Sequence, residues 1–334
     1  MLCAVPALRA FRAGFPDSRI TLIGLPWAIE LMPWLASLVD DLVFFPGYPG
    51  IPECQFDAAD VTAFLAHMQS RQFDLAVQLH GSGAHINEFT LLFGAHRTAV
   101  YRTPEDAVPL EGEGTAVPWP TRGSEIERLL ALPYALGCPD VGTALGLAAT
   151  ADDRAALGEV GEAAGLSFRE YACVHAGARF PSRRWPPERF AALADALAER
   201  GLAIVLTGTR SEAPITAAVR AAMRADAIDL TGRLGLGALG ALVSDAALVV
   251  CNDTGMSHIA AAFGTPSVVV ASGSDVSRWA PLDRERHRVL WHDVACRPCM
   301  HLRCPTGHEC AAGVDVAAAI AQADDLMEHC HGAR

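Results

Sequence analysis

The chain has 334 residues, a length typical of two domains, and its 51% hydrophobic and 19% charged residues indicate a folded rather than a disordered protein. No run approaches ~18 consecutive apolar residues and no basic segment precedes the apolar stretch 2–8, so we expect neither a membrane span nor a signal peptide. A net charge of −12 argues against a nucleic-acid partner. We therefore expect a cytoplasmic protein, with at most peripheral contact at the inner face of the membrane.

Short strands alternate with helices along the first half of the chain. Apolar periodicity and turn residues predict helices at 6–15, 57–70 and 86–93 and strands at 20–24, 42–45 and 75–79. The region 103–149 is rich in proline and glycine and resists assignment. A doubly wound domain should open with a strand, yet the helix 6–15 comes first. We therefore expect an upstream extension of about 15–25 residues that encodes one strand and its turn.

The second half alternates more regularly. The predicted strands are 171–175, 202–207, 228–230, 247–251 and 267–271, and the predicted helices are 187–200, 211–225, 236–244 and 256–263. Strands that alternate with helices indicate an α/β fold with a parallel, doubly wound sheet. We divide the chain into a first domain, residues 1–160, and a second domain, residues 161–334.

The two halves of the chain differ in charge. Residues 1–165 contain nine arginines and 20 acidic residues, a net charge of −11, whereas residues 166–334 contain 17 arginines and 18 acidic residues, a net charge of −1. Arginine supplies every basic side chain, because the sequence has no lysine. We expect the first half to repel anions at long range and the second half to hold a local anion with clustered arginines.

The strongest candidate site runs from Asn252 to His258, after a predicted strand and at the start of a predicted helix. Ligands of open α/β sheets bind at the carboxyl ends of the strands, and the free N–H groups of a helix N-terminus favour phosphate. Gly255 lets the backbone approach a ligand, and Asp253 can accept hydrogen bonds from sugar hydroxyls. A helix cap at Asp253 or Thr254 explains the same residues. An aspartic protease is disfavoured, because such a site needs two carboxylates.

Three further strand ends carry candidate residues. The turn after 171–175 includes Gly177 and leads to Arg183 beside a helix start, where clustered arginines suit a diphosphate. The turn after 202–207 includes Glu212, which suits a base or a ribose. Solvated loops and helix caps are the alternative interpretations. His80 follows the strand 75–79, at an edge that this topology turns toward the interdomain cleft, and either a turn or a catalytic histidine fits there.

Four of the ten cysteines are close together in the sequence. Cys296, Cys299, Cys304 and Cys310 lie within one short loop, with two histidines nearby. Structural zinc sites usually separate two ligand pairs by a dozen or more residues, so zinc, a disulfide pair and free thiols all remain open. A catalytic cysteine is disfavoured, because no histidine–acid pair that would orient it is evident.

The segments 183–190 and 252–266 together resemble glycosyltransferase family 9, the ADP-heptose:lipopolysaccharide heptosyltransferases. The segments 5–10, 73–75 and 296–299 extend the resemblance over nearly the whole chain. The family implies a GT-B fold, in which two Rossmann-like domains face each other across a cleft. In that fold the second domain holds the nucleotide sugar and the first holds the acceptor. The resemblance also implies inverting transfer that requires no cofactor or metal, in lipopolysaccharide synthesis.

The resemblance assigns roles to individual residues. It implies that Arg183 takes the place of a lysine that pairs with the diphosphate, and that Gly177 replaces a hydroxyl-bearing residue but keeps its N–H donor. The residues expected to contact the donor, an ADP-heptose-like nucleotide sugar, are Asp253, Thr254, Gly255 and His258. The family's presumed general base lies in a Gly-Asp turn before the first helix, and no residue here matches it by position. His80 is therefore the first alternative base to test.

Two other functions remain open on the sequence. One is a nucleotide-sugar-binding protein without catalysis, which the unmatched base supports, and the other is a GT-B-fold nucleotide-sugar epimerase. We expect this chain to bind the donor and to transfer sugar slowly. The net charge of the first half favours a glycan or lipid-linked glycan acceptor that is less anionic than a heavily phosphorylated lipid core.

Overall fold

The computed structural model of the protein describes residues 1–52, 54–105, 114–163 and 165–332. Contacts between residues divide the chain into an N-terminal unit, Cys3–Thr143, and a C-terminal unit, Ala144–Arg334. This division comes earlier in the chain than the boundary at residue 160 that the sequence suggests. Within the described residues, no helix is both long enough and apolar enough to cross a membrane.

One parallel sheet of six strands forms the centre of the C-terminal unit. The strand order is β11-β10-β9-β6-β7-β8. The strands are β6 (Tyr171–His175), β7 (Ala203–Leu206), β8 (Ala227–Asp229), β9 (Leu248–Asn252), β10 (Ser267–Val270) and β11 (His287–Leu290). The chain runs outward from β6 to β8 and then outward the other way from β9 to β11. The direction of winding therefore reverses between β6 and β9.

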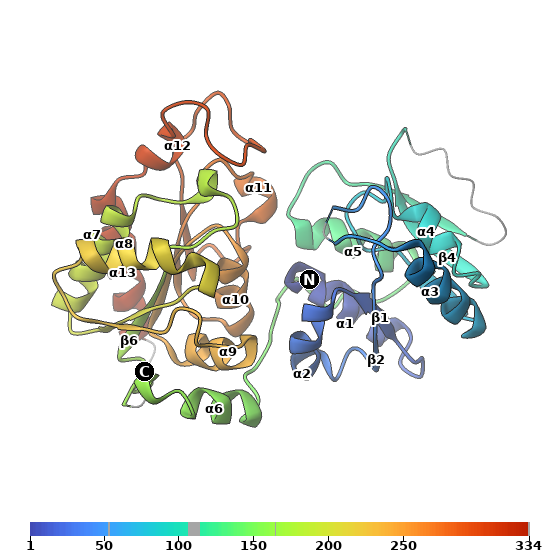
Figure 1. Cartoon of the computed structure of the whole chain (residues 1–334), viewed down its shortest axis with the longest axis horizontal. Helices are drawn as coiled ribbons and strands as arrows, with labels where there is room; N and C mark the ends of the chain where they lie inside the picture. Colours follow the sequence, from blue (N-terminus) through green and yellow to red (C-terminus); the bar gives the residue numbers. More distant parts are fainter. Residues whose placement is uncertain (53, 106–113, 164, 333–334) are drawn as a thin grey trace. The chain divides into compact units, whose positions relative to one another are not determined.

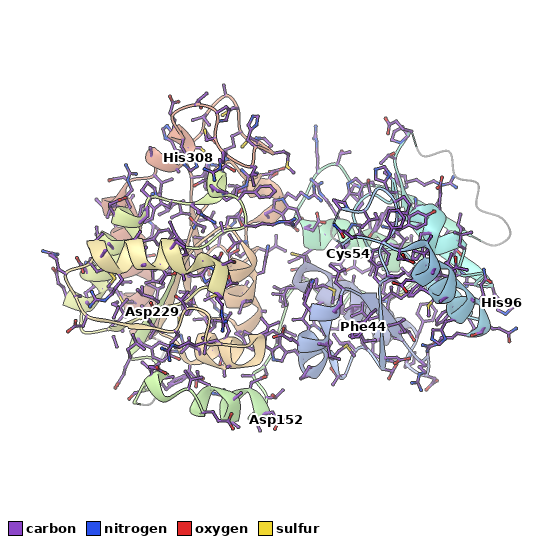
Figure 2. The ribbon with its side chains drawn as sticks, viewed as in Figure 1. Phe44, Cys54, His96, Asp152, Asp229 and His308 are labelled. Carbon is purple, nitrogen blue, oxygen red and sulfur yellow. The ribbon has the colours of Figure 1, made fainter. Side chains whose placement is uncertain are left out.

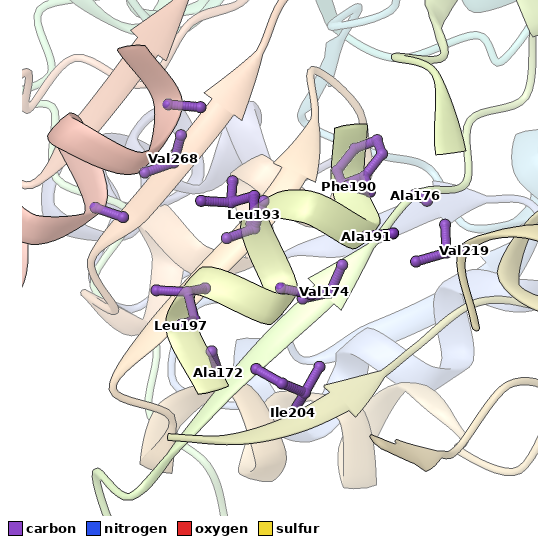
Figure 3. Packing of buried hydrophobic residues seen from close by; sticks show 14 of the residues in the cluster. Ala172, Val174, Ala176, Phe190, Ala191, Leu193, Leu197, Ile204, Val219 and Val268 are labelled. Carbon is purple, nitrogen blue, oxygen red and sulfur yellow. The ribbon is translucent and has the colours of Figure 1, made fainter. Parts of the chain in front are cut away.

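Helices cover both faces of this sheet (Figure 1). The first face carries α7 (Pro187–Glu199), α8 (Ala213–Ala222) and α13 (Val316–Gly332), and the second carries α9 (Leu236–Asp245) and α10 (Gly255–Phe263). Successive strand residues alternate between the two cores: Val174 packs with the first set and Cys173 with the second. Figure 3 shows the first core, where Leu193 and Leu197 of α7 lie over the strands. The doubly wound sheet predicted from the sequence is confirmed.

Shorter elements complete the C-terminal unit. Helix α6 (Ala151–Gly158) packs on α9, and α11 (Val276–Trp279) follows β10. Between β11 and α12 (Glu309–Ala312), the residues have no regular secondary structure. We call residues 294–310, which include the first two residues of α12, the cysteine loop.

The N-terminal unit contains two separate parallel sheets in its described residues. The first pairs β1 (Thr21–Gly24) with β2 (Asp41–Phe44), and the second has the order β3-β4-β5, with β3 (Leu75–Val77), β4 (Arg97–Arg102) and β5 (Thr115–Pro118). The helices are α1 (Val5–Gly14), α2 (Met32–Leu35), α3 (Ala58–Ser70), α4 (Asn87–Leu91) and α5 (Glu125–Ala135). The sequence predicted α1, α3, α4 and β1 to β3, but it left α2, β4, β5 and α5 unassigned.

One aromatic core joins the two sheets of the N-terminal unit. Phe64 of α3 and Phe89 of α4 stack with ring centroids 5.6 Å apart, and Ile23 of β1 and Ala76 of β3 belong to the same cluster. Arg71, which follows α3, contacts the first sheet. Its guanidinium donates to Thr21 Oγ1 at 3.0 Å and pairs with Asp41 Oδ2 at 2.9 Å, and these two residues are partners in the β1–β2 pair. The aromatic core therefore links the two sheets, and Arg71 joins the end of α3 to the first of them.

Candidate functional site

The carboxyl ends of β6 and β9 meet where the winding of the C-terminal sheet reverses, and a single buried side chain ties them together. Asn252 at the end of β9 donates through Nδ2 to the Ala176 carbonyl at 2.8 Å and to the Gly177 carbonyl at 3.3 Å. Its Oδ1 accepts the backbone N–H of Trp185 at 2.9 Å. The side chain is fully buried. It therefore fixes the turn after β6 and the start of α7 against the turn after β9, in the crevice where open α/β sheets bind ligands.

The N-terminus of α10 faces this crevice with a capped but accessible first turn. Thr254 is the cap, since its Oγ1 accepts the Met256 N–H at 3.4 Å. Gly255 is exposed, and no atom lies within 4 Å of the position that a Cβ would occupy there. His258 lies one turn further on, with its ring centre 6.4 Å from that of Trp279. Both interpretations of Thr254 thus survive: it caps the helix, and it borders backbone that a ligand can approach.

Gly177 and Glu212, predicted separately from two turns, are in contact. A Cβ at residue 177 would collide with the Glu212 carboxyl group. The same carboxylate accepts the N–H of Thr209 at 2.8 Å and its hydroxyl at 2.9 Å, which is the capping arrangement that the sequence also suggested. His175 Nε2 lies 3.8 Å from Glu212 Oε2, and burial lowers the pKa of His175 despite the opposing effect of that carboxylate. A neutral His175 imidazole therefore lies beside the Glu212 carboxylate.

Arg183 lies in a short 3-10 turn, Pro181–Arg183, and its guanidinium binds two backbone segments. It donates to the Ser272 carbonyl at 3.3 Å and to the Cys299 carbonyl, and its Nη1 is 3.4 Å from Cys299 Sγ. Ser272 follows β10, so Arg183 lies at the same edge of the sheet as the turn after β9. The sequence placed Arg183 at a strand end correctly, but it gave no sign of its contact with the cysteine loop.

Sequence reasoning missed several polar groups that follow β10. Ser272 and Ser274 are 1% and 6% exposed, and neither hydroxyl oxygen has a hydrogen-bond partner among the described residues. Asp253 Oδ2 and Arg297 Nη2 are likewise buried without a partner in the described chain. Burial lowers the pKa of Arg297, while Asp253 is among the carboxylates that oppose this shift. Buried polar groups that lack partners mark a place where a polar ligand or ordered water can bind.

The four cysteines of the cysteine loop border one small cavity of about 40 Å³, together with His301 and His308. The nine cysteines whose side chains the structure describes are free thiols. Cys304 has its pKa lowered by a hydrogen bond from the Thr306 hydroxyl, whereas burial raises the pKa of Cys310. No three histidine, cysteine or acidic side chains in the described chain are grouped closely enough to hold a metal ion. The described cysteines form no disulfide, and the choice between bound metal and free thiols stays a prediction.

Two other thiols differ from those of the loop. Cys173 in β6 and Cys251 in β9 are completely buried in the sheet, and burial raises the pKa of both.

His80, the remaining candidate, is an exposed residue in the turn after β3 of the N-terminal unit. Its carbonyl accepts a hydrogen bond from the Gln78 side chain at 2.5 Å. Its proposed catalytic role stays a prediction.

The profile of one protein family, described as glycosyltransferase family 9 (heptosyltransferase), matches residues 126–309, more than half of the chain. The chain belongs to glycosyltransferase family 9. The match includes Gly177, Arg183, Glu212 and the turn after β9, so the residues discussed above lie within it. The family that the sequence resembles is therefore confirmed.

Individual relatives align with a shorter part of this family 9 chain. It is 37% identical over 100 residues to lipooligosaccharide heptosyltransferase 2 of Haemophilus ducreyi, an alignment that covers 28% of this chain and 29% of that protein. It is 32% identical over 114 residues to lipopolysaccharide heptosyltransferase 2 of Escherichia coli, covering 33% of each. The chain thus aligns with about a third of the length of the curated relatives it matches.

Solved structures match over a greater length. The structure of E. coli ADP-heptose lps heptosyltransferase II has a TM-score of 0.77 at 18% identity and covers 98% of this chain and 95% of that one. A family 9 glycosyl transferase from Veillonella parvula has a TM-score of 0.72 at 22% identity, over 86% of this chain and 81% of that one. These neighbours confirm the two-domain, Rossmann-like GT-B fold expected from the sequence.

Proposed function

We propose that the chain is an inverting, metal-independent glycosyltransferase of lipopolysaccharide synthesis, which moves a heptose-like sugar from an ADP-heptose-like donor to a glycan or lipid-linked glycan. The observation that carries this proposal is the set of polar groups gathered where the winding of the C-terminal sheet reverses, within a chain of family 9. Asp253, Ser272 and Ser274 present buried oxygens without partners there, close to the open helix turn at Gly255. Hydroxyl-rich and phosphate-bearing ligands suit such groups.

We assign the diphosphate, the sugar and the nucleoside of the donor to different strand ends. The diphosphate lies against the N-terminus of α10 and Arg183, since both attract negative charge. Asp253 accepts hydrogen bonds from sugar hydroxyls, with Thr254 and His258 beside it. Gly177 offers its backbone N–H, and Glu212 binds the nucleoside. We keep the same residues that the sequence nominated, and we add Ser272, Ser274 and Arg297.

The proposed reaction is a single displacement at the anomeric carbon. An acceptor hydroxyl attacks that carbon from the side opposite the diphosphate, the bond to the leaving oxygen breaks, and the nucleoside diphosphate departs with the electron pair. The hydroxyl proton passes to a general base of the N-terminal unit, with His80 as the first candidate. Arg183 and the N–H groups of α10 stabilise the negative charge that develops on the leaving group. These groups thus provide the charge stabilisation that a metal ion would otherwise provide.

The acceptor proposal rests on charge. The first 165 residues have a net charge of −11, and like charge slows encounter with a heavily phosphorylated lipid core. A neutral or weakly anionic glycan, met at the inner face of the membrane, fits better. Comparison of turnover on neutral and phosphorylated inner-core acceptors tests this, and faster transfer to the phosphorylated acceptor overturns it.

Calorimetry with variants tests the donor site. Asp253→Ala should weaken binding of an ADP-sugar by about 10- to 100-fold, because it removes a charged hydrogen-bond acceptor. Asp229→Ala is the matched control, since Asp229 ends β8 at the same edge of the sheet but is exposed, and among the described residues its carboxylate accepts only the N–H of Thr231 in its own turn. Transfer assays with and without EDTA test metal independence, and NMR of the product anomer tests inversion. Equal donor affinity of wild type and Asp253→Ala contradicts the site.

A further inference from the structure

The residue before Arg183 is held by the cysteine loop on three sides. Ser182 is 1% exposed. Its N–H donates to the Leu302 carbonyl at 3.3 Å, and its hydroxyl donates to the His301 carbonyl at 2.5 Å. His308 Nε2 donates to the Ser182 carbonyl at 3.0 Å. The 3-10 turn that carries Arg183 is therefore bound to a loop more than 100 residues away in the sequence.

The guanidinium of Arg183 is held by the same loop. It donates to the Cys299 carbonyl and lies 3.4 Å from Cys299 Sγ, while the N–H of Cys299 donates to the Gly273 carbonyl at 2.9 Å. Gly273 has a φ of +60°, and a Cβ there would collide with Arg183 Nη1. Glycine thus provides both the backbone conformation and the space that let the arginine and the loop meet.

His308 adopts a backbone conformation that is unfavourable for its residue type. Its φ is +53° and its ψ is +40°, in the left-handed region, although it carries a Cβ. It precedes α12 but makes no side-chain cap for that helix. Its imidazole binds the Ser182 carbonyl instead, beside the cavity bordered by the four loop cysteines. Figure 2 labels His308 in this part of the C-terminal unit. Strained backbone of this kind persists where surrounding contacts hold it in place.

We propose that the cysteine loop is a positioning device for Arg183, in which His308 and Cys299 hold the arginine where it meets the donor diphosphate. The proposal rests on the proposed donor site and adds residues that act only through Arg183. Four of the five contacts between the loop and the turn involve a backbone carbonyl, and the loop contributes two side chains, the His308 imidazole and the Cys299 thiol. His308 is therefore a positioning residue that does not touch the donor.

The test compares two histidines of the same loop. His308→Ala removes the hydrogen bond to Ser182, whereas His301→Ala keeps the backbone carbonyl that His301 contributes and removes only an exposed side chain. In calorimetry, His308→Ala should weaken ADP binding about 5- to 10-fold, the effect expected from one lost hydrogen bond. Binding of adenosine, which has no phosphate, should stay unchanged, and His301→Ala should bind both ligands as wild type does. His308→Gln, whose amide can donate to the same carbonyl, should recover ADP binding in part.

A double-mutant cycle separates positioning from general damage to the fold. If His308 acts through Arg183, then His308→Ala should cause no further loss of ADP affinity in an Arg183→Ala background. An additional loss in that background, or equal weakening of adenosine binding, overturns the proposal. Wild-type ADP affinity in His308→Ala overturns it as well. If Arg183→Ala itself binds ADP normally, the proposed donor site fails instead. Should His308→Ala not fold, Ser182→Ala removes the hydroxyl bond to the His301 carbonyl and so tests a second attachment of the turn to the loop; ADP affinity equal to wild type in that variant overturns the proposal.

Discussion

The two units of the chain are built from similar strands and helices, yet only the C-terminal unit joins its strands into one sheet. Its six strands place the turns after β6, β7, β9 and β10 along a single edge, where Gly177, Glu212, Asp253 and Ser272 follow them. The described strands of the N-terminal unit form two sheets, so their ends do not share one hydrogen-bonded edge. A continuous parallel sheet is what gathers polar residues from distant segments into a site.

The comparison also separates two ways of holding a unit together. In the C-terminal unit, backbone ladders join all strands, and buried polar groups such as Asn252 connect the loops. In the N-terminal unit, the aromatic cluster around Phe89 links strands of two sheets that do not pair with each other. Substitutions that destabilise the C-terminal unit should therefore weaken donor binding, whereas substitutions that destabilise the N-terminal unit should leave donor binding unchanged. Three measurements test this contrast.

The largest effect is expected from Trp185→Ala. Trp185 is fully buried, its ring is 5.2 Å from that of Phe190, and its Nε1 donates to the Val314 carbonyl at 3.2 Å. Removing it should cost about 3–5 kcal/mol of unfolding free energy, measured by urea denaturation. Hydrogen exchange should speed up in the C-terminal unit alone. Trp291→Ala, which removes a ring that is 47% exposed, should change stability by less than about 0.5 kcal/mol. Equal loss of protection in both units would break the comparison.

A pair of buried asparagines gives an intermediate effect and the sharpest contrast. Asn252→Ala leaves the Trp185 N–H and the Ala176 carbonyl without their partner, at a cost of about 2–3 kcal/mol. Asn87→Ala in the N-terminal unit removes a similar bond to the Tyr101 carbonyl, 2.8 Å long, and should cost about 1–3 kcal/mol. Only Asn252→Ala should weaken binding of an ADP-sugar in calorimetry. Comparable weakening by Asn87→Ala would show that donor binding depends on both units.

A pH dependence of the C-terminal unit is the third effect, and at its full extent it is similar in size to the asparagine losses. Burial lowers the pKa of His287 to about 4, and its Nδ1 lies 2.9 Å from Ser267 Oγ. Above the unfolded pKa of about 6.5, both states are neutral and the full stability is present. As the pH falls toward 4, the unfolded state takes up the proton first, so stability declines by at most about 3 kcal/mol. Urea midpoints between pH 7.5 and 4.5 should fall less in His287→Gln, and parallel losses would contradict this origin.

The sequence predicted five of the six strands of the C-terminal sheet, because these are short apolar runs bounded by turns, as in Tyr171–His175 and Leu248–Asn252. It left the edge strand β11 and the helix α13 unassigned. It failed between residues 97 and 135, apart from 106–113, which lie outside the described residues. There β4 begins and ends with arginine, and α5 contains Pro133 within a region rich in proline and glycine. A usable signal was present at α5, because Ser124 and Glu127 form a capping box.

The sequence likewise predicted some residues of the candidate site but not the contacts that support them. Local pattern placed Asp253, Gly255, Arg183 and Glu212 at strand ends, because that inference needs only a strand followed by a helix start. The support of Arg183 could not be inferred, because Ser182 meets His301 and His308 across 119 and 126 residues. Ser272 and Ser274 follow a predicted strand, so the rule that nominated Asp253 would also have nominated them.

The burial of Cys173 and Cys251 has a practical consequence. Thiol reagents act on thiolates, and these two are protonated and enclosed, whereas Cys296 of the cysteine loop is exposed and Cys304 is acidified by Thr306. An environment-sensitive fluorophore attached at neutral pH will therefore not report from the sheet. In a variant in which the partly exposed Cys54 of the N-terminal unit and Cys330 are replaced, it will report from the neighbourhood of Arg183, where ligand occupancy can be followed as light emission.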